Sequence, residues 1–368
     1  MGCKDSGKIL KWPGFYYFIL AGWLATTAMH IPDGYLSPAT SLVMFLLVAP
    51  FWTIGLRRIR HSMSARSIPL IALVAAFSFV IMMFNMPLPG GTSGHIVGSA
   101  LAAIILGPEV AVIAISIALI IQALFFGDGG ILAIGANCFN MAVVIPYMAH
   151  AIYRSFSKGT PLTSRRRWVG AALGGWVGVT AGAFFAGVEF GLQPLLFRNA
   201  EGVPLYAPYP LSIAVPAMVI PHMLVAAVVE GVLTALVIAY LQRFNVSVLE
   251  TAEKPDELTG GAGSRRLRWL WVGLAALALV TPLGLLAPGT AWGEWSTQEL
   301  ARLGIKSIPA GMEKLANLWG APLARYNLRM LGNTSLGYVL SAVVGILVIC
   351  GIVWLFTKLL TGGKEPKE

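Results

Sequence analysis

Long apolar runs recur along the chain, and they restrict the folds open to it more than any other feature. Of its 368 residues, 57% are hydrophobic and only 11% are charged, proportions that a water-soluble domain rarely has. An α-helix needs about 20 consecutive apolar residues to cross a bilayer. The sequence therefore predicts an all-α, polytopic membrane protein. Its nine predicted helices span approximately residues 36–56, 67–86, 96–106, 108–126, 131–153, 168–192, 211–241, 267–287 and 337–359.

Lysine and arginine form four short clusters between the apolar runs, within residues 57–66, 154–167, 243–268 and 358–367. A net charge of +10 could suggest a nucleic-acid partner, but basic clusters beside apolar helices are what the positive-inside rule requires. All four clusters share one side of the membrane if the mature N-terminus lies outside and residues 107–109 form a cytoplasmic turn. We therefore expect a multi-pass protein of the cell inner (cytoplasmic) membrane, with a cytoplasmic C-terminus and no nucleic-acid partner.

Residues 1–28 have the three parts of a cleavable secretory signal. Lysines at positions 4, 8 and 11 form a positive region, residues 15–25 form an apolar stretch, and small residues follow at 26–28. We expect cleavage after Ala28, which leaves Met29 as the first residue. In the alternative interpretation, this stretch is an uncleaved first helix.

The mature chain divides into two predicted units. Residues 29–241 hold seven of the helices, and residues 267–368 hold the other two together with an external loop at about 288–336. Residues 242–266 between the units are polar and include the small-residue run 259–264, which is typical of a flexible linker. We expect this linker to be cytoplasmic.

Small residues recur every four positions on the helix predicted at 168–192, namely Gly170, Gly174, Gly178, Gly182 and Ala186. They predict a groove where another backbone can approach closely. Packing within the chain and a docking face for a partner are both compatible with this pattern.

The first two residues of the predicted mature chain could bind a metal ion. Cleavage after Ala28 leaves Met29 with a free amine and places His30 second. The amine, the backbone nitrogen of His30 and its imidazole can then surround one ion in a plane. Ni(II) and Cu(II) accept square-planar nitrogen fields. Without cleavage, His30 is a loop histidine.

His95 could supply a fourth nitrogen donor. It ends the segment Pro87–His95, which is rich in glycine and is predicted to lie on the same outer side as His30. Irregular backbone at membrane depth persists only where protein or a water-filled cavity satisfies its polar groups. The alternative role of His95 is that of a hydrogen-bonded loop residue. His61 and His150 lie near cytoplasmic helix ends, and we assign them no chemistry.

Several polar residues fall within the apolar runs, where they are costly and usually face the bundle interior. Asn85, Gln122 and Asn137 could orient the histidine ligands from a second layer, or they could hold helices together. For His222 and Glu230 we favour the structural role of joining helices.

No enzyme signature stands out in the sequence. It contains no H-E-x-x-H or Walker A sequence and no G-x-S-x-G elbow. We therefore expect neither an enzyme nor a cofactor, and any use of ATP would require another subunit.

Three motifs resemble the CbiM/NikM family: residues 29–34 (Met-His-Ile-Pro-Asp-Gly), residues 91–95 (Gly-Thr-Ser-Gly-His), and His222 followed by Glu230-Gly231. Members are the substrate-binding membrane (S) components of energy-coupling-factor transporters for cobalt and nickel. The resemblance covers about residues 29–241. It implies that Met29, His30 and His95 bind the ion, and that the partners are a transmembrane coupling protein and two ATPase subunits.

The C-terminal unit resembles the two-helix NikN/PDGLE-type component, here fused to the first unit. The resemblance rests on residues 281–295, and the chain departs from that family because it lacks Pro-Asp-Gly-Leu-Glu itself.

The combined interpretation is a substrate-specific component for high-affinity uptake of Ni(II) or Co(II). The main alternative is a stand-alone divalent metal channel or secondary transporter, and a second is a membrane enzyme with a catalytic metal. A channel needs weak, multi-site binding, whereas a catalytic metal usually keeps an open coordination position.

Overall fold

The computed structural model describes residues 29–62, 68–88, 92–244, 246–253, 264–287, 292–302, 308–328 and 332–361. The predicted signal segment, residues 1–28, lies outside the described residues. Its cleavage stays a prediction.

The first unit is a bundle of helices, and each of its seven predicted helices coincides with helical structure. Three π-helical segments interrupt or join them, at η2 (Gln122–Phe126), η3 (Cys138–Val144) and η4 (His222–Ala226). Such segments are rare and often mark functional sites. The α-helices are α2 (Pro38–Ser62), α3 (Ile68–Met82), α4 (Ser99–Leu106), α5 (Pro108–Ile121), α6 (Ile134–Asn137), α7 (Ile145–Ser157), α8 (Arg166–Leu196), α9 (Leu211–Pro221) and α10 (Ala227–Phe244).

Within the described residues, six helices are long and apolar enough to cross a membrane. The short helix α4 is buried along its whole length, so it lies inside the protein rather than against lipid. The prediction of a polytopic, all-α membrane protein is confirmed. The six helices are Pro38–His61, Pro108–Phe126, Arg166–Leu196, Leu211–Phe244, Leu267–Leu286 and Thr334–Phe356.

A short antiparallel hairpin was not predicted. Strand β1 (Met86–Leu88) pairs with β2 (Thr92–Gly94), and Met86 lies opposite Gly94. The segment that we expected to be irregular is therefore partly ordered by its own backbone hydrogen bonds. The hairpin carries the chain from the end of α3 to His95.

The glycines of α8 face other helices of the same chain. A Cβ at Gly174 would lie 2.7 Å from the carbonyl oxygen of Ala149, and one at Gly178 would lie 3.0 Å from that of Ile145. Both carbonyls belong to α7, which packs along α8. The structure confirms close packing within the chain, because all five small residues of this groove are buried by the described residues.

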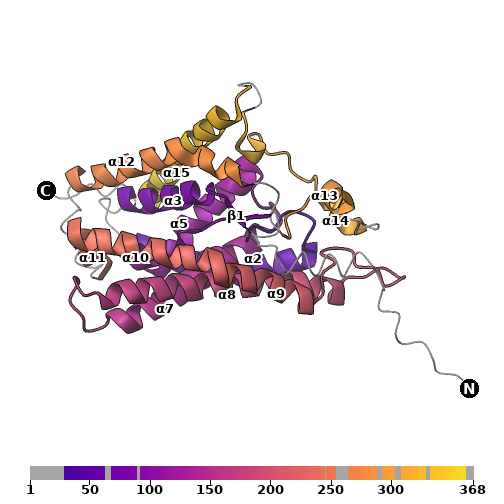
Figure 1. Ribbon diagram of the computed structural model, residues 1–368, viewed down its shortest axis with the longest axis horizontal. Coiled ribbons are helices and arrows are strands. Elements are labelled where there is room, and N and C mark those ends of the chain that lie inside the picture. The colour runs from indigo at the N-terminus through magenta and orange to yellow at the C-terminus, as the bar shows by residue number, and fades with distance from the viewer. Residues whose placement is uncertain are drawn as a thin grey trace, which may run out of the picture.

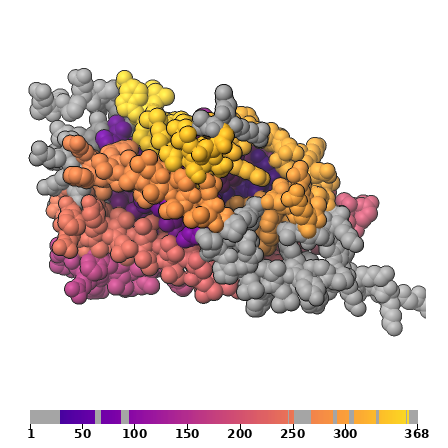
Figure 2. All heavy atoms as spheres, turned by 45° about the horizontal axis from the view of Figure 1, so that its top comes forward, coloured from indigo at the N-terminus to yellow at the C-terminus, as the bar shows by residue number. Residues whose placement is uncertain are grey.

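The C-terminal unit lies along one flank of the first unit. Helices α12 and α15 pack against α3, and a Cβ at Gly345 would collide with the ring of Phe79. Figure 2 shows this orange and yellow unit beside the indigo residues of the first. Its elements are α12 (Ser264–Val280), η6 (Thr281–Leu286), α13 (Thr297–Arg302), α14 (Ala310–Leu315), η7 (Ala324–Tyr326) and α15 (Thr334–Thr361).

The predicted linker at 242–266 is partly helical. Helix α10 continues to Phe244 and helix α11 spans Val246–Glu253, so the expectation of a flexible coil was wrong for these residues. The cause is an apolar pair, Val248 and Leu249, which is buried where α11 meets α4 and α10. Residues 254–263 lie outside the described residues.

Candidate metal site

The two histidines that we singled out meet inside the protein. His30 precedes α2 and His95 precedes α4, yet His30 Nδ1 lies 2.9 Å from His95 Nε2. The two side chains are 2% and 3% exposed. In Figure 1 the neighbouring hairpin lies at the same end of the bundle as α13 and α14. We call this the histidine end.

The spacing of the two imidazoles suits a shared ion as well as a hydrogen bond. Two nitrogens bound at adjacent corners of a square, each roughly 2.0–2.1 Å from a metal, lie about 2.9 Å apart. Burial, and secondarily the neighbouring His30, lower the pKa of His95 to about 3. His95 is therefore neutral near pH 7, which is the form that binds metals.

Hydrogen bonds to the backbone of Ile31 hold the segment directly after His30 in place. Asn137 accepts a hydrogen bond from the Ile31 nitrogen at 2.8 Å and donates one to the Ile31 carbonyl at 3.2 Å. The nitrogen of Gly130 donates to the same carbonyl at 2.9 Å. Met29 is 1% exposed. Asn137 thus positions the main chain that carries His30, rather than the imidazole itself.

Asp33 joins the same segment to the loop after η2. Its carboxylate accepts hydrogen bonds from the nitrogens of Leu132 at 2.9 Å and Ile131 at 3.0 Å. Burial raises the pKa of Asp33, although these two hydrogen bonds oppose the rise. Sequence reasoning did not assign Asp33 a role. The signal that could have found it is Pro-Asp-Gly, which is typical of a side-chain-stabilised turn.

Asp128 is a second carboxylate that the sequence analysis missed. Its Oδ1 lies 3.3 Å from His30 Nδ1, and its Oδ2 accepts a hydrogen bond from the Tyr326 hydroxyl at 2.6 Å. It stands between Gly127 and Gly129, whose φ values of 64° and 85° are left-handed and suit glycine. The sequence signal that could have identified Asp128 is a single acidic residue between glycines, directly after a membrane-spanning helix.

The other two proposed supporting residues differ in their contacts. Gln122 donates to the Tyr326 hydroxyl at 3.0 Å and to Asp128 Oδ2 at 3.4 Å, so it reaches His30 through one intermediate residue. Asn85 lies just before β1, and its backbone nitrogen bonds to Met83. Among the described residues, no hydrogen bond joins the Asn85 side chain to His30 or His95. Its supporting role stays a prediction.

Glu230 joins α10 to the segment after His95. Its Oε2 accepts hydrogen bonds from the nitrogens of Val97 and Gly98, each at 2.9 Å, and its Oε1 accepts one from Ala100 at 3.4 Å. These contacts agree with the structural role that we favoured. They also fix the backbone within two residues of His95. His222 bonds through Nδ1 to the carbonyl of Met218 in the turn before it.

Side chains alone do not complete a metal site here. Among the described residues, no group of three or more His, Cys, Asp or Glu side chains could hold a metal ion. An ion between His30 and His95 would need donors of another kind, such as backbone or terminal nitrogens.

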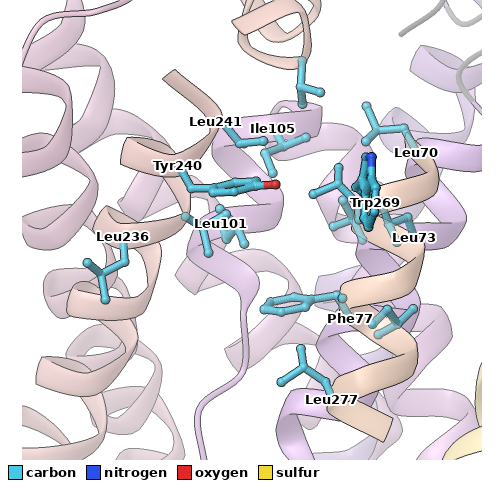
Figure 3. A pocket seen from close by; sticks show the side chains of 16 residues that line it. Leu70, Leu73, Phe77, Leu101, Ile105, Leu236, Tyr240, Leu241, Trp269 and Leu277 are labelled. Carbon is cyan, nitrogen blue, oxygen red and sulfur yellow. The ribbon is translucent and has the colours of Figure 1, made fainter. Parts of the chain in front are cut away.

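Two cavities lie away from the histidine end. One, of about 420 Å³, has an almost wholly apolar lining that includes Leu101, Tyr240 and Trp269, and Figure 3 shows Tyr240 and Trp269 on opposite walls. It offers a metal ion no ligands. The other, of about 1220 Å³, is lined by His61, His150 and several basic residues. This cavity lies where α2 and α4 end. Because arginine and lysine line it, we call this end of the bundle the basic end.

Comparison with known protein families shows which family the chain belongs to. Residues 30–248 match the CbiM family, described as the cobalt uptake substrate-specific transmembrane region. The chain belongs to the CbiM family. Residues 266–362 match the PDGLE domain. The resemblance noted from the three motifs and the C-terminal unit is confirmed.

Individual relatives agree with this assignment. The fused nickel transport protein NikMN of Rhodobacter capsulatus is 50% identical over 88% of this chain and 96% of its own length. The probable fused nickel transport protein LarMN of Lactiplantibacillus plantarum is 42% identical over 87% and 95%. A crystal structure of a transition metal transporter has 45% identity and a TM-score of 0.56, and covers 63% of this chain and all of that one. This CbiM-family chain is a membrane component of metal uptake and not an enzyme.

Proposed function

We propose that this CbiM-family chain is the substrate-specific component of an ATP-driven transporter that takes up Ni(II) or Co(II). The observation that carries the proposal is the buried contact between His30 and His95 at one end of a membrane bundle. Relatives described as nickel transport proteins share nearly the whole chain, and another is described as a cobalt transport protein.

The proposed ligands are four nitrogens: the Met29 amine, the His30 backbone nitrogen, His30 Nδ1 and His95 Nε2. This set needs only two side chains. A chelate that begins at the chain end also explains why His30 directly follows Met29. It requires cleavage after Ala28, or translation that starts at Met29, because an amide nitrogen at Met29 is a poor donor.

The energy source and the orientation are part of the proposal. The chain has no Walker A sequence, so ATP hydrolysis would come from ATPase subunits joined to it by a transmembrane coupling protein. The mature N-terminus would lie outside the cell inner membrane and the C-terminus in the cytoplasm, since that orientation places the four basic clusters inside.

The burial of both histidines favours a carrier over a stand-alone channel or secondary transporter. Conduction through a channel requires sites weak enough for the ion to leave. A closed nitrogen site releases its ion only after a conformational change, which the coupling protein and ATPases would drive.

Reconstitution into vesicles tests this proposal. The chain with its coupling protein and ATPase subunits should accumulate Ni(II) only when ATP is present, and the chain alone should bind one ion without transporting it. Ni(II) passage through vesicles that hold the chain alone would favour the channel. Intact mass should show Met29 as the first residue, and a mass that retains residues 1–28 would remove the amine from the ligand set.

A further inference from the structure

The cavity at the basic end concentrates positive charge that the proposed transport function does not use. Among the described residues that line it, Glu109 is the single acidic side chain. Five positive charges therefore face one negative charge, and the cavity favours an anion. The basic side chains come from α2, α7, α8 and the loop before α8, namely Arg57, Arg58, Arg154, Lys158 and Arg167.

Two helices each turn one face toward this cavity. On α2 the lining residues include Ile54, Arg57 and Arg58, and on α7 they include His150 and Arg154. Residues three or four positions apart share one face of a helix. The arginines of both helices thus lie at the ends of these faces, where they can approach one anion from two sides.

Arg167 forms a fixed part of the cavity wall. Its side chain is 2% exposed. Its Nε donates a hydrogen bond to the carbonyl of Pro161 at 2.9 Å, and its Nη2 donates one to the carbonyl of Thr160 at 2.7 Å. These acceptors are uncharged, so they hold the guanidinium in place without cancelling its charge. Arginine stays protonated in proteins, and its charge therefore adds to the potential in the cavity.

The position of the cavity indicates where an anion would come from. Helix α2 is long and apolar enough to span a membrane over Pro38–His61, so its last turns lie at the level of phospholipid headgroups. Ile54 lines the cavity and is 46% exposed. Val43 and Leu47, on the same face of α2, are also exposed. An acyl chain can lie along this apolar face while its headgroup enters the cavity.

We propose that the basic end binds the phosphate headgroup of an anionic membrane lipid. The planar guanidinium of arginine matches two phosphate oxygens at once, and basic pockets between membrane helices are typical sites for such headgroups. The volume of about 1220 Å³ leaves room for a headgroup. A zwitterionic lipid carries the same phosphate together with a cation, which this cavity would repel.

Native mass spectrometry of the full chain in a neutral detergent tests the proposal. The chain is titrated with phosphatidylglycerol, which is anionic, and with phosphatidylcholine of the same acyl chains, which has no net charge. Phosphatidylglycerol should bind about tenfold or more tightly, as expected for a hydrogen-bonded charge. Glycerol phosphate, which lacks acyl chains, should compete poorly. If it displaces phosphatidylglycerol at equal concentration, the site takes a soluble phosphate compound and the lipid proposal is wrong.

Two variants locate the binding. Arg57→Gln combined with Arg154→Gln should bind phosphatidylglycerol about tenfold or more weakly than the parent. Lys158→Gln changes an exposed loop residue and should weaken binding about two- to fivefold. Thermal unfolding shows whether each variant is folded, and Lys158→Gln keeps the test valid if the double variant is not.

The matched control is Arg60→Gln combined with Arg243→Gln. Both arginines are exposed near the ends of α2 and α10, neither lines the cavity, and the change in net charge is the same. The control should bind phosphatidylglycerol like the parent. An equal loss in the control would show that overall charge, and not this cavity, attracts the lipid. Equal binding of the two lipids by the parent would also overturn the proposal.

Discussion

The two ends of the helical bundle each hold two histidines, but their surroundings differ. At the histidine end, His30 and His95 are buried and in contact. At the basic end, His61 and His150 line a large cavity together with arginine and lysine. The side chain of His61 is exposed, and His150 Nδ1 lies 3.3 Å from the carbonyl of Ala103.

The two histidine pairs differ in their neighbours, and this difference fits the proposal that the histidine end, rather than the basic end, binds the ion. At the histidine end, the Asp128 carboxylate lies 3.3 Å from His30 Nδ1, and Asn137 and Glu230 hold the backbone that follows each histidine. At the basic end, Arg57, Arg154 and Lys158 line the cavity, and their positive charges would repel a cation. Predictions that alter one end and leave the other intact test this contrast.

The largest effect should come from removing either buried imidazole. His30→Ala and His95→Ala should each weaken Ni(II) binding by more than about 100-fold, the upper range for losing a residue that only supports a ligand. Equilibrium titration with Ni(II) and Co(II) measures it. His61→Ala and His150→Ala are the controls and should bind normally. If His30→Ala and His95→Ala bind Ni(II) like the parent, the proposed metal site is wrong, although the family assignment still holds.

Acid should weaken binding at the histidine end. Since the pKa of His95 is about 3, its imidazole carries no proton that must leave at neutral pH. The protons released are those of the Met29 amine, whose ordinary pKa is about 7.7–8.0, and of the His30 amide. Below about pH 7 the loss of two protons predicts an affinity that falls about 100-fold per pH unit. Titrations at several pH values measure the slope, and a tenfold slope would show that only one of these protons leaves.

A smaller effect should follow Glu230→Gln. The two carboxylate oxygens of Glu230 accept hydrogen bonds from three backbone nitrogens after His95. Glutamine has only one acceptor oxygen, so the segment after His95 should be held less firmly. We expect a stability loss of about 2–3 kcal/mol and Ni(II) binding about tenfold weaker, by thermal unfolding and titration. Glu109→Gln, which changes a glutamate at the basic end, should alter neither. Equal losses in both variants would mean that the two ends are not independent.

The smallest effect should follow a cut in the linker between Gly260 and Gly263. The units also contact each other through α3 and α15 and at the histidine end. Two co-expressed halves should therefore retain Ni(II) binding and uptake. A matched cut at Gly320 severs the loop that bonds to Leu124 and Phe125, and should weaken binding. Complete loss after the first cut, with both halves in the membrane, would contradict the two-unit interpretation.

The sequence by itself determined the class of the protein and the position of its helices. Apolar runs must become helices in a membrane, because lipid leaves backbone polar groups no other partners. The same logic drew attention to Asn137 and Glu230, since a polar group in such a run needs a partner. His30 stood out because the predicted cleavage places it second in the mature chain, and His95 because it ends a glycine-rich segment between apolar runs.

Only the tertiary structure decided which of these residues meet. His30 and His95 are 65 positions apart, and no periodicity links them. Asp128 is a loop residue whose closeness to His30 Nδ1, at 3.3 Å, arises only from folding, because the two residues are far apart in the chain. The burial of Val248 and Leu249 against other helices likewise explains why part of the predicted linker is helical. The local sequence pattern indicates that a buried polar residue requires a hydrogen-bond partner. The packing of distant segments determines which residue that partner is.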